Sequence, residues 1–448
     1  MKVLKFGGIS VKNALSIVAV KDILRRDNEK KVVVVSAFYG VTDTLCETVE
    51  QIKQNNVKKA FDLTNKTENL CLKISSELIG CRNSHNFIKE KFKEIRQFIP
   101  ALCLLGEVTP RSIDMILSYG EKISSFVIAD YLNATGLKTA YIDALQIIKT
   151  DSNFNRASVD MTKTGASVKK ILLPLFKSND CIVTAGFIGC DKDGSVTTLG
   201  RGGSDYTASV IAVCAAAEKL EIWKDVNGIM TTDPKVVKKA KPVSQLSYKE
   251  ASELAFFGAK ILHPKTIRSA IMAGIPVYVK KTSEPDYPGT LIEKNSENKR
   301  KVKAATFQKN ITIVNICSEK MLGAYGFLSK VFDVFTSYKT PVDLITTSEV
   351  NISVTIECCE HLQDIVKDLS AFAEVDITKD VAIISLVGEG IKYTPGIAVK
   401  CFFALKDINV IMVSMGASEA NLSVIVKQSE LQRAVSKLHH EFFEKKGE

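Results

Sequence analysis

Over its first three hundred residues the chain alternates short apolar segments with longer amphipathic ones, and this alternation limits the possible folds more than any other feature. The amphipathic stretches, such as residues 11–25 and most of 50–130, have helical spacing. The apolar segments have strand length and lie at Val3–Phe6, Val32–Ser36, Thr139–Ile142, Cys181–Ala185, Lys219–Trp223 and Pro276–Val279. Such alternation is typical of a parallel sheet covered by helices on both faces. We therefore expect an α/β fold, a three-layer α/β/α domain with a mainly parallel central sheet.

The C-terminal third contains an internal repeat. Ser348–Val354 (SEVNISV) recurs as Ser418–Val424 (SEANLSV), and each copy follows an apolar strand and precedes a helical segment. A charged, turn-rich stretch, Ser283–Lys309, separates this region from the α/β part. We predict a catalytic domain over residues 1–295 and two small ferredoxin-like (βαββαβ) modules over residues 305–378 and 379–448.

Composition excludes several classes of protein. The net charge is +10, but the lysines are dispersed, so we expect no nucleic-acid partner. The longest apolar runs, such as Lys31–Ala37, are far too short for a membrane span, so we expect no membrane association. The 11 cysteines form no C-x-x-C pair and no signal-type segment follows Met1, which together favour reduced thiols and a cytoplasmic location. We predict no metal site built from protein side chains.

Three glycine-rich turns follow predicted strands and carry the chemically versatile side chains. Lys5–Ser10 (KFGGIS) lets the backbone approach an anion and places Lys5 to neutralise a phosphoryl group, although such turns are as often structural. It matches neither the P-loop nor the dinucleotide pattern. Gly200–Asp205 (GRGGSD) offers N–H groups, a guanidinium, a hydroxyl and a carboxylate, which suit a carboxylate or phosphate ligand. Trp223–Lys235 would suit a nucleotide base and ribose, but by itself an ordinary loop is the better explanation of this segment.

Six motifs in a fixed order resemble those of aspartate kinases of the amino acid kinase family. They are KFGGIS, VVVVSAFYGVTDTL (32–45), SYGEKISS (118–125), GFIG with TTLGRGGSD (186–189 and 197–205), EIWKDVNGIMTTDPK (221–235) and FGAKILHP (257–264). The repeated C-terminal modules resemble ACT domains. The resemblance covers nearly the whole chain. Fused relatives carry an additional homoserine dehydrogenase half that has no counterpart in this sequence, so we expect a monofunctional enzyme.

The resemblance implies transfer of the γ-phosphoryl group of ATP to the β-carboxylate of L-aspartate, with Mg²⁺ bridging the phosphates, as the first step of lysine, threonine and methionine biosynthesis. It implies catalytic roles for Lys5, Asp205 and Lys260. The ATP contacts it implies are Lys5, Gly7, Gly8, Ser36, Lys224, Asp225, Met230, Lys235 and Lys260. The aspartate contacts are Ser36, Glu121, Arg201, Ser204 and Asp205. Many relatives carry other residues at Ile9, Leu145, Lys224, Met230 and Lys235, mostly around the expected nucleotide pocket.

The first ACT-like module matches the pattern of lysine-inhibited relatives. The matching positions are Met321, Phe327, Leu328, Val342, Asp343, Ser348 and Glu349, with Ala324 in place of a more usual polar residue. By resemblance, Asp343 and Glu349 receive the amino groups of L-lysine and Ser348 its carboxylate, although the same turn could merely join two strands. We expect L-lysine to be an allosteric inhibitor of a homodimer, or a tetramer, that pairs through its ACT modules.

Two alternatives remain open at this point. The phosphoryl acceptor could be another acidic amino acid or a carbamate-like anion, although Glu121 and Arg201 both match the aspartate pattern. The chain could instead be a non-catalytic amino-acid sensor, against which the presence of Lys5, Asp205 and Lys260 argues.

Overall fold

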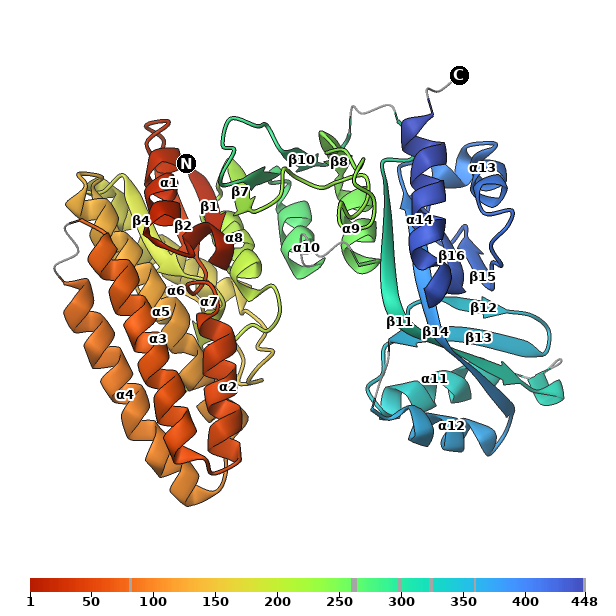
Figure 1. The fold of residues 1–448 in the computed structure, drawn as a ribbon, viewed down its shortest axis with the longest axis horizontal. Helices are drawn as coiled ribbons and strands as arrows, with labels where there is room; N and C mark the ends of the chain where they lie inside the picture. Colours follow the sequence, from red (N-terminus) through yellow and green to blue (C-terminus); the bar gives the residue numbers. More distant parts are fainter. Residues whose placement is uncertain (80–82, 259–263, 297–299, 322–324, 358–359, 446–448) are drawn as a thin grey trace. The chain divides into compact units, whose positions relative to one another are not determined.

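The chain folds into two compact units (Figure 1). The computed structural model describes residues 1–79, 83–258, 264–296, 300–321, 325–357 and 360–445. Residues 1–229 and 261–296 belong to the first unit, and residues 230–260 and 297–448 belong to the second. The predicted domain limits at residues 295, 305 and 378 remain predictions.

A mainly parallel sheet forms the centre of the first unit. Within this unit its strand order is β3-β4-β2-β1-β7-β9-β10, and only β10 runs antiparallel to its neighbour. The strands are β1 (Lys2–Phe6), β2 (Lys31–Val35), β3 (Thr139–Ile142), β4 (Cys181–Ala185), β7 (Lys219–Lys224), β9 (Val277–Lys281) and β10 (Thr290–Glu293). Every residue of β1, β2 and β4 is buried, as expected for apolar strands covered on both faces. The six predicted strands and the predicted fold class are confirmed.

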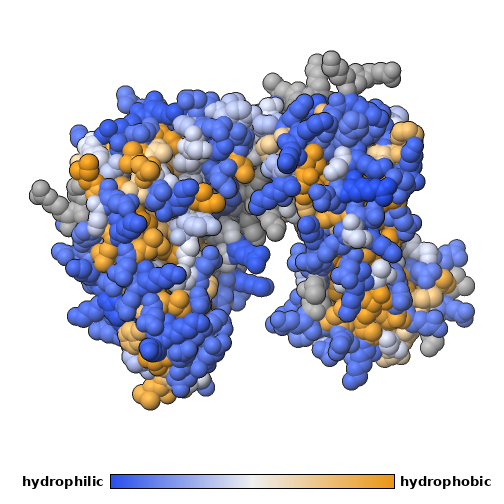
Figure 2. Space-filling view, in the orientation of Figure 1, coloured by the Kyte–Doolittle hydropathy of each residue, from blue (hydrophilic) through white to orange (hydrophobic). Residues whose placement is uncertain are grey.

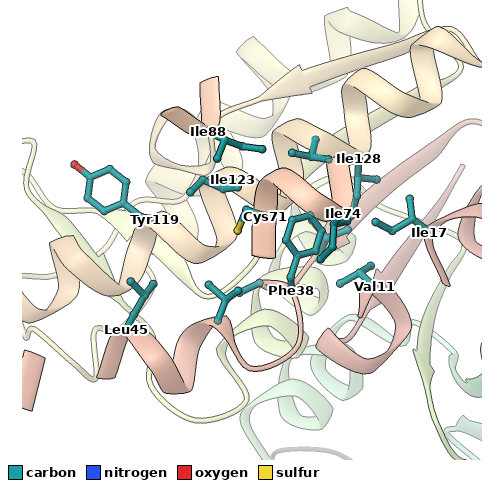
Figure 3. Packing of buried hydrophobic residues seen from close by; sticks show 14 of the residues in the cluster. Val11, Ile17, Phe38, Leu45, Cys71, Ile74, Ile88, Tyr119, Ile123 and Ile128 are labelled. Carbon is teal, nitrogen blue, oxygen red and sulfur yellow. The ribbon is translucent and has the colours of Figure 1, made fainter. Parts of the chain in front are cut away.

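Helices pack on both sides of this sheet (Figure 1). They are α1 (Ala14–Leu24), α2 (Val41–Lys53), α3 (Val57–Glu77), α4 (Ser84–Leu105), α5 (Pro110–Ala134), α6 (Ala144–Ile147), α7 (Met161–Ser167), α8 (Gly203–Cys214) and α10 (Pro264–Ala273). Figure 3 shows how side chains of α3, α4 and α5 meet those of α1, α2 and the loop before α2 in one apolar cluster. A short hairpin of β5 (Ile188–Cys190) and β6 (Val196–Thr198) lies outside the main sheet.

The second unit is built on a six-stranded antiparallel sheet, in the order β12-β13-β11-β14-β16-β15. Its strands are β11 (Ala304–Cys317), β12 (Ile345–Thr347), β13 (Asn351–Glu357), β14 (Glu374–Val387), β15 (Met412–Met415) and β16 (Asn421–Lys427). Its helices are α11 (Phe327–Ser337), α12 (Leu362–Ser370), α13 (Ile397–Ala404) and α14 (Leu431–His439). A preceding segment adds β8 (Gln245–Ser247) and α9 (Tyr248–Phe256).

Two long strands are shared by both ACT-like modules. Each is interrupted by a residue with positive φ, Asn310 (59°) in β11 and Asp380 (55°) in β14. The first half of β11, Ala304–Gln308, pairs with the second half of β14 and contributes Ala305 to the core of the second module. The second module therefore takes one strand from the chain that precedes the first module, and β14 runs on from one module into the other.

Polar side chains dominate the face of the molecule that Figure 2 presents, with apolar patches between them. None of the helices in the described ranges is both long enough and apolar enough to cross a membrane.

Candidate active site

The carboxyl ends of four neighbouring strands meet at one edge of the first unit's sheet. Backbone hydrogen bonds tie the loops that follow them together: Gly7 N–H donates to Trp223 O (3.3 Å), and Ser36 N–H donates to Phe6 O (3.1 Å). Gly186 N–H donates to Val35 O in the same way (2.8 Å). In parallel α/β sheets this edge is where ligands bind. The turns at Gly7-Gly8, Ser36, Gly186 and Lys224 therefore form one continuous rim.

Close packing behind this rim requires glycine at position 186. A Cβ at Gly186 would lie 2.5 Å from the Cβ of Ser204, so only glycine lets the start of α8 approach β4. The next residue, Phe187, adopts a left-handed backbone (φ 68°) that is unusual for an aromatic residue. Its N–H donates to Thr207 Oγ1 (3.0 Å), which helps to hold this conformation. The sequence analysis did not single out Phe187, although its place between two glycines was a signal.

Three charged side chains from different elements form a cluster at the rim, in which Lys5 and Asp205 are buried and Lys224 is half-buried. Lys5 Nζ, on β1, lies 2.6 Å from Asp205 Oδ1, in the first turn of α8. Lys224 Nζ, at the end of β7, lies 2.9 Å from the other oxygen, Oδ2. Lys5 is 6% exposed and Asp205 is 4% exposed. One carboxylate thus orients two ammonium groups, and the catalytic role of Asp205 remains a prediction. Lys224 was expected to contact the nucleotide, and its contact with Asp205 was not foreseen.

Burial sets the protonation equilibria in this cluster. Burial lowers the pKa of Lys5, and the neighbouring charge of Asp205 opposes that shift only in part. Burial also acts on Asp205, but the charges of Lys5 and Lys224 outweigh it and hold the pKa of the carboxyl below its usual value. The cluster therefore pairs two lysines with one firmly ionised carboxylate, and a desolvated ammonium group favours the arrival of an anion.

Glu121 faces the same centre from the middle of α5. It is only 3% exposed, and its Oε2 is buried with no hydrogen-bond partner among the described residues. Burial raises its pKa to about 8, and the charge of Lys5 opposes this shift. A buried carboxyl group with an unused oxygen is ready to receive a donor from a ligand, and an ammonium group is the donor that would best stabilise its charged form.

The remaining predicted substrate contacts lie along the same rim. Ser36 follows β2, and its carbonyl accepts a hydrogen bond from Ser124 Oγ on α5 (2.9 Å). Ser204 is buried at the start of α8. Arg201 is exposed, in a turn between Gly200 (φ 74°) and Gly202 (φ 71°). Gly7 precedes the 3-10 turn that Gly8 begins.

The predicted nucleotide contacts are divided between the units. Lys224 and the exposed Asp225 belong to the first unit. Met230, which pairs with Pro242, and the exposed Lys235 belong to the second. Lys260 lies outside the described residues.

The predicted lysine-binding residues lie in the first ACT-like module. Met321, Phe327 and Val342 pack in its core, while Leu328 and Glu349 are exposed. Asp343 follows Val342, and its Oδ2 is buried without a partner among the described residues. Burial raises the pKa of Asp343 to about 6, and the charge of Glu357 adds to this effect. Ser348 Oγ accepts the N–H of Asn351 (3.1 Å) inside the repeated turn. Ala324 lies outside the described residues.

Models of two known families match the chain. The model of the amino acid kinase family matches residues 1–281, and an ACT domain model matches residues 384–442.

Two curated relatives are similar along nearly the entire chain. Aspartokinase 1, chloroplastic, of Arabidopsis thaliana is 36% identical over 99% of this chain and 80% of its own length. Lysine-sensitive aspartokinase 3 of Escherichia coli is 32% identical over 98% of both proteins.

Solved structures agree with these matches. The fold is similar to E. coli aspartokinase III in complex with aspartate and ADP, with a TM-score of 0.89 and 32% identity over 99% of this chain and 100% of that chain. It is also similar to the same enzyme in complex with lysine and aspartate, with a TM-score of 0.80 over 99% of each chain.

Proposed function

The chain belongs to the amino acid kinase family and is an aspartate kinase, and from this premise we propose that it transfers the γ-phosphoryl group of ATP to the β-carboxylate of L-aspartate. The product is 4-phospho-L-aspartate, and the reaction opens the biosynthesis of lysine, threonine and methionine. The cluster of Lys5, Asp205 and Lys224 at the carboxyl edge of a parallel sheet carries the proposal.

Charge neutralisation is the main demand of this reaction. The β-carboxylate of aspartate, with a pKa of about 3.9, is already ionised at neutral pH, so no general base is needed. Since two anions must approach each other, positioning and positive charge lower the barrier. We assign Lys5 and Lys260 to the transferring phosphoryl group, and Asp205 to the orientation of Lys5 and Lys224.

The nucleotide is assigned to the rim that follows β1, β2 and β7. Gly7 and Gly8 allow the phosphates to approach the backbone closely, and Ser36 lies beside them. Lys224, Asp225, Met230 and Lys235 are the proposed contacts to the rest of the nucleotide.

Mg²⁺ is proposed to enter with ATP as part of the substrate. Among the side chains in the described ranges, no group of three His, Cys, Asp or Glu residues could hold a metal ion. Both oxygens of Asp205 are already engaged by lysines. Phosphate oxygens are the hard ligands that Mg²⁺ prefers, and bound there the ion neutralises phosphate charge.

L-Aspartate is proposed to bind between Glu121 and Arg201. The unused oxygen of Glu121 suits the α-ammonium group, and the guanidinium of Arg201 suits the α-carboxylate, with Ser204 nearby. These contacts leave the β-carboxylate as the group that faces Lys5.

L-Lysine is proposed to inhibit the enzyme through the first ACT module. The unused buried oxygen of Asp343 supports this assignment, because an ammonium group of lysine would satisfy it. Glu349, Ser348, Met321, Ala324, Phe327, Leu328 and Val342 complete the proposed site. We further propose a cytoplasmic homodimer, or a tetramer, that pairs through the ACT modules.

The proposal is tested by trapping the acyl phosphate with hydroxylamine in the presence of ATP and Mg²⁺. L-Aspartate should give product that L-lysine suppresses, whereas L-glutamate should give none. If L-glutamate also gives product, L-aspartate is not the specific phosphoryl acceptor. If product forms with L-aspartate but L-lysine does not suppress it, the proposed lysine site is wrong. Folded protein that binds lysine but forms no product would indicate a sensor instead of an enzyme.

A further inference from the structure

Asp114 is a fully buried carboxylate that lies away from the lysine cluster and has no role in the assignments above. It lies in α5 and is 0% exposed. Its Oδ2 accepts the backbone N–H of Asn155 (2.9 Å) and the backbone N–H of Thr198 (2.8 Å). Its Oδ1 accepts the hydroxyl of Thr198 (2.6 Å). The Asp114 side chain therefore joins α5 to two other segments, which lie 41 and 84 residues further along the chain.

The pattern of these donors suits a carboxylate better than an amide. All three partners donate, and they approach both oxygens, so both oxygens must accept. An asparagine would keep one accepting oxygen for the two N–H groups, and its NH₂ group would meet the Thr198 hydroxyl only if that hydroxyl turned to accept. Burial raises the pKa of Asp114, and the three hydrogen bonds oppose that shift.

The segments that Asp114 joins are the ones that carry the proposed aspartate contacts. Glu121 follows Asp114 by seven residues in α5, two turns along the same side of the helix and about 10 Å away along its axis. Thr198 ends β6 and is followed by Leu199 and Gly200, which lead directly to Arg201. The Asn155 carbonyl lies 3.1 Å from the position that a Cβ would occupy at Gly200, so the Asn155 loop also packs on this turn.

We propose that Asp114 is a positioning residue for aspartate binding, which anchors the turn bearing Arg201 to the helix bearing Glu121. This inference rests on the proposed function. The exposed Arg201 lies in a turn of three glycines and has few constraints of its own. The anchor two residues before Gly200 supplies the constraint, so that the α-ammonium and α-carboxylate groups of L-aspartate meet side chains at a fixed separation.

The test compares four variants in the hydroxamate assay. Asp114→Asn replaces one of the two accepting oxygens by an NH₂ donor, and Thr198→Val removes only the hydroxyl donor. Thr198→Ser restores that hydroxyl. Thr64→Val is the matched control, because Thr64 is also 0% exposed and donates to Ala60 O (2.8 Å) in the distant helix α3. Hydrogen exchange of residues 199–203 is followed in the same proteins without substrates.

We expect Asp114→Asn to raise the KM for aspartate about tenfold and Thr198→Val about threefold, with KM for ATP within about twofold of wild type. Thr198→Ser and Thr64→Val should behave as wild type, and only the first two variants should exchange faster at residues 199–203. Unchanged KM for aspartate in Asp114→Asn, or a parallel rise of both KM values, would overturn the role of Asp114. A wild type without aspartate-dependent product would instead overturn the proposed function, so the two failures are distinguishable.

Discussion

The two units of this chain each bury a lysine against a carboxylate, and the surroundings of the two pairs differ. In the second unit, Lys303 Nζ lies 2.9 Å from Glu250 Oε2, with side chains that are 2% and 0% exposed. Glu250 also accepts the N–H of Ser247 (2.7 Å) and of Glu389 (2.7 Å), so α9 is fixed to the strand ends of the ACT region. In the first unit, Asp205 is shared by Lys5 and Lys224, and Glu121 beside them keeps an unused oxygen.

This difference separates a structural ion pair from a ligand site. The Glu250 carboxylate is balanced by one ammonium group and supplied with further donors, so it offers nothing to a ligand. The cluster of Lys5, Lys224 and Asp205 has two ammonium groups for one carboxylate, and Glu121 beside it has a buried oxygen to which no described residue donates. A buried polar group without a hydrogen-bond partner lowers the free energy of unfolding, and a bound ligand can remove this penalty by providing the missing partner. The comparison therefore predicts loss of activity from mutation in one unit and loss of stability from mutation in the other.

The largest effect is expected for Lys5→Met. Removing this ammonium group from the transferring phosphoryl group should lower kcat by about 10³-fold or more. The free energy of unfolding should change by less than about 1 kcal/mol, because Asp205 keeps Lys224 as its partner. Enzyme assays and chemical denaturation measure the two quantities. If Lys5→Met unfolds readily but retains turnover, Lys5 stabilises the fold and does not serve the reaction.

Lys303→Met should have the opposite profile. Because Glu250 would remain as a buried charge without its counter-ion, the unfolding free energy of the ACT-containing unit should fall by about 3–5 kcal/mol. The kcat of the folded protein should stay within about threefold of wild type. The double variant Lys303→Met/Glu250→Gln should recover part of the lost stability, since it removes the uncompensated charge. If Lys303→Met is as stable as wild type, the ion pair of Lys303 and Glu250 contributes little to the free energy of unfolding.

A half-buried carboxylate of the first ACT-like module, Asp343, extends the comparison to regulation. Among the described residues, neither Asp343 Oδ2 nor Glu121 Oε2 has a hydrogen-bond partner, so Asp343 too should serve a ligand. Asp343→Asn should raise the lysine concentration for half-inhibition about 10- to 100-fold and leave kcat without lysine unchanged. Asp333→Asn, an exposed carboxylate of the same module, is the control. Equal lysine sensitivity in both variants would remove Asp343 from the proposed site.

The features that the sequence could predict are those with a local signal. Apolar strands such as Val32–Val35 and the turns that end them are visible in a few consecutive residues, and the six predicted strands lie where the structure has them. Likewise Lys5 and Asp205 stand in recognisable motifs. The role of Lys224 as second partner of Asp205 depends on the pairing of β1 with β7, which places residues 217 positions apart, such as Lys5 and Ile222, side by side.

Longer-range arrangements had no such signal. The repeated turn indicated two similar modules, but not that β14 runs through both or that Ala304–Gln308 completes the second one. Asp114 looked like any polar residue of an amphipathic helix, because its partners are brought to it only by the folding of the loops around Asn155 and Thr198. These features arise from tertiary packing, which decides where polar side chains find partners.

The smallest expected effect is a dependence of the KM for aspartate on pH, which tests whether Glu121 receives the α-ammonium group of the substrate. With a pKa of about 8, this carboxyl is mostly protonated at pH 7 without substrate. The α-ammonium group of aspartate favours the carboxylate, so binding should release a proton, and the KM for aspartate should fall as pH rises. Since the ionised fraction rises from about one tenth to one half between pH 7 and 8, the expected fall is about fivefold.

The control for this pH dependence is Glu121→Gln, which has nearly the same shape but cannot ionise. Its KM for aspartate should be higher than that of wild type and should lose the fivefold dependence between pH 7 and 8. KM for ATP, measured in parallel, reports on Lys5 and Asp205 and should not follow the same curve. A KM for aspartate that rises with pH, or a dependence that persists in Glu121→Gln, would mean that another group takes up the proton. The unused oxygen would then not be the receptor for the α-ammonium group, and Glu121 would resemble Glu250 more closely than Asp343.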